Sequence, residues 1–210
     1  MVVTEICVES LEEVVIACQS GANRVELCSD LSVGGTTPNN DLLATVVDHC
    51  HSKIVQVFAM LRCRGGDFVY SDIEKVIMLE DCRSVVEAGV DGIVCGALLQ
   101  DGSIDAKFME DVRLMTGKIP LTFHKAFDDS TGDVVTTMKL LAEIGFTRVL
   151  SSGRSATALE GIETLKLMVR CAAPIVIVAG SVRAHNVKDL LNATHAVEVH
   201  SRSPAICKAI

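Results

Sequence analysis

The stretch Asn23-Arg24-Val25-Glu26-Leu27-Cys28 alternates apolar and polar side chains, and the fold prediction starts from this pattern and its recurrence along the chain. A period of two is typical of a β-strand, because successive side chains point to opposite faces. One face of this stretch is apolar, with Val25 and Leu27, and the other carries charge. Similar short runs rich in β-branched residues recur along the chain. The sequence therefore predicts eight strands, over residues 3–8, 23–28, 54–61, 91–95, 119–124, 147–151, 174–179 and 196–200.

Segments with helical spacing separate these strands, at 11–18, 40–50, 71–89, 105–116, 131–144, 156–170 and 184–191. Two of them begin with a capping-box pattern, Ser10 with Glu13 and Ser71 with Glu74. Strands that alternate with helices predict a TIM (β/α)8 barrel, built by residues 1–210 as a single domain. The rival fold is a doubly wound open sheet, which is disfavoured because no Gly-x-Gly-x-x-Gly turn follows the first strand. The pattern ends soon after the eighth strand, so we expect the last helix to be truncated or missing.

Composition narrows the class of function. The chain has 210 residues, of which 49% are hydrophobic, and its net charge of −8 disfavours nucleic acid and anionic membranes as partners. Its longest apolar run, around residues 172–180, is too short to span a membrane, and the first residues do not resemble a signal peptide. The nine cysteines include no Cys-x-x-Cys pair, which favours free thiols in a reducing compartment. We therefore expect a cytoplasmic protein.

The polar face of each strand should point into the barrel, because the apolar face packs against the helices. Three carboxylates are then expected inside, Glu5, Glu26 and Glu198, together with several arginines and two histidines. Buried charges are costly unless they are paired, so these groups either form a network that only closes the barrel or meet a ligand. Position favours a ligand, because barrel enzymes keep their sites at the C-terminal strand ends. The side chains predicted there are Arg62, Arg64, His124, Ser152 and His200.

One hypothesis is an enzyme that acts on a small phosphorylated or carboxylated metabolite. Arg62 and Arg64 flank a turn with two glycines, and their guanidinium groups suit a carboxylate or a phosphate, so they form the predicted anion clamp. Turns after strands six and seven precede helices and are expected to bind the anion as well. The residues of these turns are Ser152, Gly153, Gly180 and Ser181.

His124 is the predicted general acid or base of such an enzyme. Glu26 or Glu198 would orient it or exchange protons with it, and Asp128 would reach over the mouth from beyond its strand end. The alternatives are structural, with Asp128 as the cap of the next helix and His124 as a satisfied core residue. The reaction class stays open between proton transfer, an aldol-type lyase and phosphate-ester chemistry.

Several motifs together resemble one known family over essentially the whole chain. They include Thr4-Glu5-Ile6-Cys7, Gly21-Ala22-Asn23-Arg24-Val25-Glu26-Leu27-Cys28, Arg62-Cys63-Arg64-Gly65-Gly66-Asp67-Phe68, Thr122-Phe123-His124-Lys125-Ala126-Phe127-Asp128 and Glu198-Val199-His200-Ser201. These motifs resemble the CutC family of copper homeostasis proteins. The resemblance implies a TIM barrel, a cytosolic location (or a nuclear one in a eukaryote), a homodimer or larger homo-oligomer, and a role in copper handling. It also implies Cu(I) binding by Cys7 and Cys28.

The second hypothesis is therefore a Cu(I) site. Cu(I) is soft and favours two or three thiolates at low coordination. Cys7 and Cys28 are expected on adjacent strands about 4.8 Å apart, so both sulfurs can meet one ion, and His200 on the eighth strand would add a nitrogen. The alternatives are that both thiols are small core residues, or that the chain is a scaffold that buffers metal weakly.

Two departures from the family pattern lie near these sites. Cys63 takes the place of a proline in the Arg-Pro-Arg turn, and Lys125 takes the place of an arginine after His124. The remaining cysteines are expected to pack among the helices, except Cys207, which has no assigned role. Those packing cysteines are Cys18, Cys50, Cys82, Cys95 and Cys171.

Overall fold

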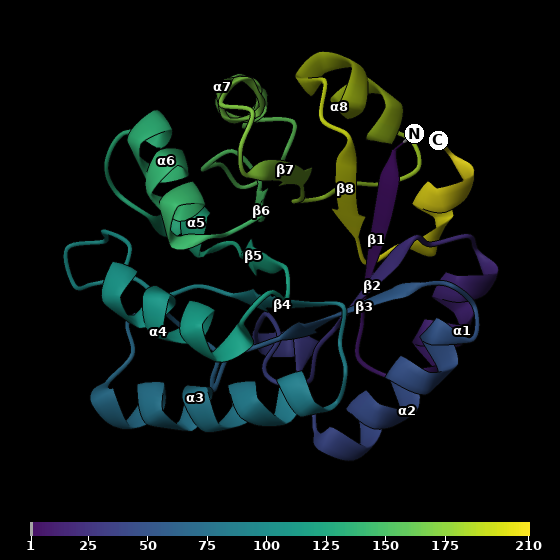
Figure 1. The fold of residues 1–210 in the computed structure, drawn as a ribbon. Coiled ribbons are helices and arrows are strands. Elements are labelled where there is room, and N and C mark those ends of the chain that lie inside the picture. Colours follow the sequence, from purple (N-terminus) through teal and green to yellow (C-terminus); the bar gives the residue numbers. More distant parts are fainter. Residues whose placement is uncertain (1) are drawn as a thin grey trace.

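The eight predicted strands form one closed parallel barrel in the computed structural model, which describes residues 2–210. The strands are β1 (Val3–Val8), β2 (Arg24–Leu27), β3 (Gln56–Met60), β4 (Gly92–Cys95), β5 (Leu121–Phe123), β6 (Arg148–Ser151), β7 (Ile175–Val178) and β8 (Glu198–Ser201). Each strand pairs with its neighbours in chain order, and β1 pairs with β8 to close the barrel (Figure 1). The predicted TIM barrel is confirmed, and the open sheet is wrong.

Helices surround this barrel on the outside (Figure 1). They are α1 (Leu11–Gln19), α2 (Asn40–His51), α3 (Asp72–Glu87), α4 (Ala106–Thr116), α5 (Ala126–Asp129), α6 (Val134–Ile144), α7 (Ile162–Arg170) and α8 (Val187–Thr194). Beyond β8 the described chain forms the short 3-10 helix η2 (Pro204–Lys208). No helix within residues 2–210 is long and apolar enough to cross a membrane.

Three helices start later than the sequence pattern predicts, and one of them, α8, begins at Val187 instead of residue 184. The chain after β5 first forms α5, which the pattern did not predict, and α6 therefore begins at Val134 instead of residue 131. Helix α7 begins at Ile162 instead of residue 156, because the chain before it is held in turns. In these turns the Ala158 N–H donates to the Gly180 carbonyl, and Ser152 is bonded to Asp128.

The two predicted capping boxes also differ. At α3 the box is complete, because Ser71 accepts from the Glu74 N–H and the Glu74 carboxylate accepts from the Ser71 N–H. At α1 only half of it forms. Ser10 caps the helix, but the Glu13 carboxylate accepts from the N–H of Glu9 instead.

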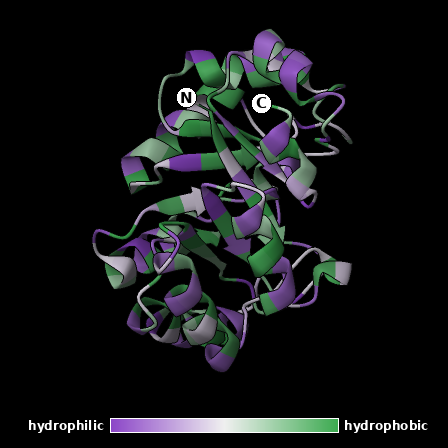
Figure 2. Ribbon diagram, turned by 90° about the vertical axis from the view of Figure 1, so that its right-hand side faces the viewer, coloured by the Kyte–Doolittle hydropathy of each residue, from purple (hydrophilic) through white to green (hydrophobic). Residues whose placement is uncertain are grey.

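The two faces of each strand lie in different surroundings, as the alternation predicts. Val25 and Leu27 pack in the main core between the strands and the helices, whereas Arg24 and Glu26 are buried among the charged residues of the other face. Figure 2 shows the alternation of hydrophobic and hydrophilic residues along strands and helices. A smaller apolar cluster belongs to the inward faces, formed by Cys7, Cys28, Phe58, Met60 and Val94. The barrel interior is therefore a mixture of charge, thiol and hydrocarbon.

Candidate metal and anion site

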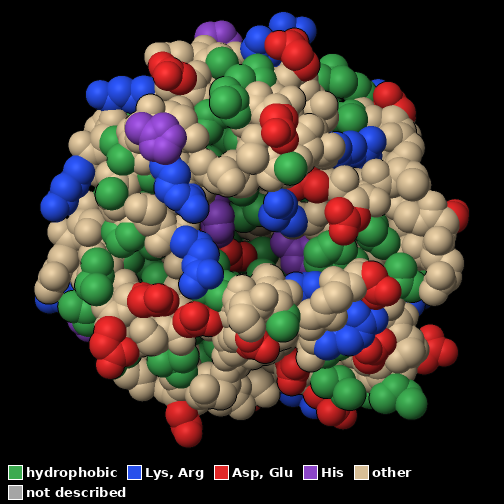
Figure 3. Space-filling model, turned by 180° about the vertical axis from the view of Figure 1, so that it is seen from behind, with side chains coloured by type: hydrophobic (Ala, Val, Ile, Leu, Met, Phe, Trp, Pro, Cys, Tyr) green, Lys and Arg blue, Asp and Glu red, His purple; other side chains and the backbone are tan. Residues whose placement is uncertain are grey.

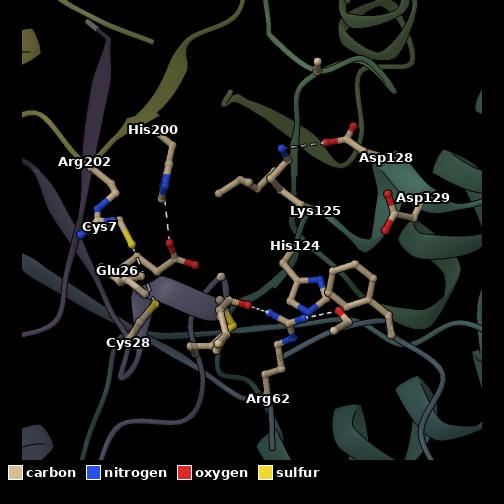
Figure 4. Close-up of a pocket in the computed structure, with 18 of the residues that line it drawn as sticks. Cys7, Glu26, Cys28, Arg62, His124, Lys125, Asp128, Asp129, His200 and Arg202 are labelled. Atoms are coloured by element: carbon tan, nitrogen blue, oxygen red, sulfur yellow. Dashed lines mark hydrogen bonds and ion pairs between the residues drawn. The ribbon is translucent and has the colours of Figure 1, made fainter. Parts of the chain in front are cut away.

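A pocket of about 690 Å³ opens at the C-terminal ends of the strands. Of the predicted site residues, those that line it are Cys7, Glu26, Cys28, Arg62, His124, Asp128 and His200. Figure 3 shows the pocket as a central hollow with histidine and basic side chains at its edge and carboxylate within it. In Figure 4 the thiols, Glu26 and His200 lie on one side of this space, and Arg62 and His124 lie on the other. The two hypotheses from the sequence therefore meet in one pocket.

Cys7, Glu26 and His200 form a compact group on the first side. One potential ligand atom from each residue lies within 4.8 Å of the other two. The parallel register explains this placement, because Cys7 stands beside Glu26 across β1 and β2, and Glu5 stands beside His200 across β1 and β8. The Sγ atoms of Cys7 and Cys28 are 3.9 Å apart, so the predicted pair of thiols is in contact.

An ionic network occupies the barrel interior next to this group. Arg24 is 1% exposed, and it donates to Glu5 through Nε and to Glu198 through Nη2, both at 2.5 Å. Arg148 donates to the same Glu198 carboxylate at 3.1 Å. The ring of Phe58 lies 4.6 Å from the Arg24 guanidinium and 5.4 Å from that of Arg148. Glu198 is thus held by two arginines and does not line the pocket, and the structure does not bring it to His124.

Glu5 joins this network to His200. Its carboxylate lies 2.7 Å from Nδ1 of His200, and Glu26 lies 3.6 Å from the same nitrogen. Burial alone would raise the pKa of Glu5, but Arg24 and His200 together lower it to about 2. Burial would lower the pKa of His200, but Glu26, Cys7 and Glu5 raise it well above its usual value.

The pKa values of Cys7 and Glu26 are raised, in contrast to the lowered pKa of Glu5. The hydrogen bond with Cys28 and burial raise the pKa of the Cys7 thiol, and burial raises the pKa of Glu26. Without a metal ion, Cys7 is therefore a neutral thiol and His200 a charged imidazole, next to the carboxyl groups of Glu5 and Glu26. A metal ion bound here would take the place of protons.

His124 lies on the other side of the pocket and is 4% exposed. Its Nδ1 accepts from the Ala126 N–H at 3.2 Å, which places the proton of the neutral ring on Nε2. That Nε2 has no hydrogen-bond partner in residues 2–210. Burial and the nearby charge of Arg62 lower the pKa of His124 to about 3. At neutral pH this side chain is an uncharged donor, and the ring packs 4.7 Å from that of Phe68.

The two predicted clamp arginines differ in position. Arg62 lines the pocket, but its Nη atoms donate to the carbonyls of Val33, Gly35 and Gly66, and only the buried Nε lacks a partner in the described chain. Arg64 does not line the pocket. It donates to Glu74 and to Asp67, and it thereby holds the loop between β3 and α3.

The predicted phosphate turns are not part of the pocket lining. Ser152, Gly153, Gly180 and Ser181 are not among the residues that line it. Asp128 does line it, and its carboxylate accepts from the hydroxyl groups of Ser151 and Ser152 and from the N–H of Arg154. Asp128 therefore fixes the turn after β6, and no hydrogen bond between Asp128 and His124 exists in residues 2–210.

Sequence reasoning missed three basic side chains at the mouth. Lys125, Arg154 and Arg202 line the pocket together with Arg62. Arg202 is 56% exposed and its closest carboxylate, Glu9, is 3.7 Å away. The signal for Arg202 was present, since it follows the inward-facing His200 by two positions. Lys125 and Arg154 lie in turns, where the apolar–polar alternation of strands gives no prediction of side-chain direction.

A model of the CutC family matches residues 2–205 of this chain. The copper homeostasis protein cutC homologue of Homo sapiens is 40% identical over 198 residues, covering 93% of this chain and 71% of that protein. The homologue of Mus musculus matches to the same extent. A CutC structure from Streptococcus agalactiae has a TM-score of 0.93 at 34% identity and covers 97% of this chain and 100% of that chain.

A more distant structure shares the fold alone. Deoxyribose phosphate aldolase from Aeropyrum pernix has a TM-score of 0.71 at 13% identity, covering 98% of this chain and 88% of that chain. The pocket with its two thiols in contact thus lies in a barrel of which residues 2–205 match one family. This chain belongs to the CutC family, and its human and murine relatives carry the name of copper homeostasis proteins.

Proposed function

We propose that this protein binds Cu(I) through Cys7 and Cys28, with His200 as a third ligand, and so takes part in copper homeostasis. The observation that carries the proposal is the 3.9 Å separation of the two Sγ atoms. With metal–thiolate bonds of about 2.3 Å, one ion would contact both sulfurs at an angle of about 115°. This angle is close to trigonal, and it leaves room for one nitrogen ligand.

The surroundings suit a soft, desolvated ion. Both thiols are buried, and Met60 and Phe58 pack in the same apolar cluster. Excluding water disfavours the hydrated divalent state, and thiolate donors prefer Cu(I). All nine cysteines are free within the described chain, which is consistent with a reducing compartment such as the cytoplasm, where Cu(I) is the stable copper ion.

A competition titration with bathocuproine tests the proposal. The wild-type protein is expected to hold close to one Cu(I) per chain, and Cys7→Ala and Cys28→Ala are expected to lose it. Cys171→Ala is the matched control, because Cys171 ends α7 far from the pocket lining. Unchanged stoichiometry in both pocket variants would refute the site.

A second candidate function is catalysis on a small anionic metabolite. It is favoured by the basic side chains of the mouth and by the buried Nε2–H of His124, which has no acceptor in residues 2–210. A bound carboxylate or phosphate would supply such an acceptor. A thermal-shift screen of sugar phosphates and carboxylates tests this function. A hit is expected to depend on His124, and a screen without a His124-dependent hit contradicts the candidate.

Self-association is a further part of the proposal. Ile73, Val76 and Ile77 form an exposed apolar stripe on α3, with exposed fractions of 75%, 55% and 43%. Burying such a stripe between copies would remove apolar surface from water. Sedimentation velocity is expected to show a dimer or larger assembly that Ile73→Lys and Ile77→Glu weaken. A monomeric wild type would refute it.

A further inference from the structure

The group around Cys7 contains a donor that the copper proposal does not use. Besides the imidazole of His200, a carboxylate oxygen of Glu26 lies within 4.8 Å of the Cys7 sulfur. Cys28 touches Cys7 but does not join this three-residue group. Carboxylate oxygen is a hard ligand that Cu(I) does not favour. Two overlapping sets of donors therefore share Cys7.

The mixed set has the composition of a zinc site. Zn²⁺ is bound in proteins by thiolate, imidazole and carboxylate together, at about 2.0–2.3 Å. A tetrahedral ion with such bonds needs donor atoms about 3.5 Å apart, so small side-chain rotations would close the group around an ion. The three residues come from adjacent strands, β1, β2 and β8, whose pairing holds their backbones in register.

The surrounding residues hold the ligands in place. Glu5 bonds to Nδ1 of His200, and Arg24 bonds to Glu5. In zinc proteins a carboxylate commonly accepts from the non-ligating nitrogen of a ligand histidine, which fixes the ring and raises its basicity. With Nδ1 held by Glu5, the ligand atom of His200 would be Nε2. Glu5 is fully buried, so this partner cannot turn away into solvent. The ionic network thus acts as a rigid support for the group.

Three protein ligands leave one position of a tetrahedral ion open. The same three residues line the 690 Å³ pocket, whose mouth carries Lys125, Arg154 and Arg202. Three ligands and an open position are the pattern of catalytic zinc, whereas structural zinc has four protein ligands. The open position would face this pocket, which lies beside Cys7, Glu26 and His200 in Figure 4.

We propose that Cys7, Glu26 and His200 form a site for a divalent ion of the Zn²⁺ class, with an open coordination position facing the pocket. This site shares Cys7 and His200 with the Cu(I) site, so the two ions compete. Glu26 belongs to the zinc set alone, and Cys28 belongs to the copper set alone. These two residues therefore separate the proposals.

The experiment measures both metals on the same variants of the full chain. Zn²⁺ is titrated against a chromophoric chelator, and Cu(I) is titrated against bathocuproine. Glu26→Gln is expected to weaken Zn²⁺ binding by at least about tenfold and to leave Cu(I) binding unchanged. Cys28→Ser is expected to do the reverse, and Cys7→Ser is expected to lose both ions.

Co²⁺ serves as a spectroscopic substitute for zinc at the same position. The wild type is expected to show an absorption band of cobalt–thiolate charge transfer that Cys7→Ser abolishes and Cys28→Ser retains. Glu26→Asp keeps a carboxylate and is expected to restore part of the affinity lost in Glu26→Gln. Far-ultraviolet circular dichroism of each variant verifies that the barrel is folded.

The outcomes separate the two proposals. If Glu26→Gln binds Zn²⁺ as tightly as the folded wild type, or if Cys28→Ser loses zinc and copper equally, the zinc site is refuted. If Cys28→Ser retains Cu(I) while Glu26→Gln loses Zn²⁺, the copper site fails and the zinc site stands. Absence of a cobalt–thiolate band in the wild type also overturns the zinc site.

Discussion

Charged and polar side chains face the barrel interior in two regions, the ionic network around Arg24 and the pocket mouth around Arg62 and His124. The two regions differ in how many of their buried donors have hydrogen-bond partners. In the network, Glu5, Arg24 and Glu198 are buried and pair with one another, and the partly exposed Arg148 donates to Glu198. At the mouth, His124 and Arg62 each keep a buried N–H without an acceptor in residues 2–210. An inward-facing charged side chain therefore does not by itself mark a functional site. A site is marked where the fold leaves donors unsatisfied.

The largest expected effect is on the network. Arg24→Met leaves Glu5 and Glu198 buried without their main partner, and breaking a buried pair in this way costs about 3–5 kcal/mol of unfolding free energy. Urea denaturation measures this loss. Arg24→Lys keeps the charge but loses the two-pronged contact, so we expect a smaller loss. A loss below about 1 kcal/mol in Arg24→Met would contradict the structural role of the network.

The next largest effect is expected at Asp128, a carboxylate at the pocket mouth that accepts hydrogen bonds from Ser151, Ser152 and Arg154. Asp128→Asn removes an ionised acceptor from two hydroxyl groups and two backbone N–H groups, for an expected loss of about 2–3 kcal/mol. The neighbouring Asp129→Asn is the control, with an expected change within about 0.5 kcal/mol in the same denaturation assay. Equal effects in the two variants would show that the turn after β6 does not depend on Asp128.

The third prediction concerns the pH dependence of stability. The folded protein keeps His124 neutral down to a pKa of about 3, whereas the unfolded chain binds a proton near pH 6.5. Stability from this residue is therefore complete above pH 6.5 and is lost as the pH falls toward 3. At pH 5 the loss should be about 2 kcal/mol relative to pH 8.

His124→Gln tests this dependence. The variant is expected to lack this part of the acid-induced loss, as measured by urea denaturation between pH 8 and pH 5. His185→Gln, at an exposed position, is the control for removal of an imidazole. Identical pH profiles for wild type and His124→Gln would show that the buried neutral imidazole does not govern acid stability.

The smallest effect on stability is expected for the basic side chains at the mouth of the pocket. Lys125→Ala and Arg202→Ala remove half-exposed side chains whose closest carboxylates are 3.9 Å and 3.7 Å away, so each should change stability by at most about 0.5 kcal/mol. Both should nevertheless reduce the thermal shift produced by any anion found in the screen. If either variant unfolds the barrel or leaves anion binding unchanged, the proposed difference between the ionic network and the pocket mouth is wrong.

Several site predictions depended on local pattern and held only in part. Arg62 and Arg64 look equivalent in the sequence, yet Arg64 turns to Glu74 and Asp67, away from the pocket. Ser152 and Gly180 follow strand ends, yet neither lines the pocket, and they bond instead to Asp128 and to the Ala158 N–H. Which way a loop side chain turns depends on the partners that the fold brings near, and these partners are distant in the chain.

The alternation of strand and helix patterns along the chain predicted the barrel, and the period of two in residues such as Val25 and Glu26 predicted which side chains face its interior. The reason is local, because strand geometry and the burial of apolar faces leave a single assignment. Only the tertiary structure decided which interior groups pair. Cys7 meets Glu26 and Glu5 meets His200 because the barrel closes in one register, with β8 beside β1. Glu5 and His200 are 195 positions apart in the chain, and their contact depends on this closure of the barrel and not on residues near either one in the sequence.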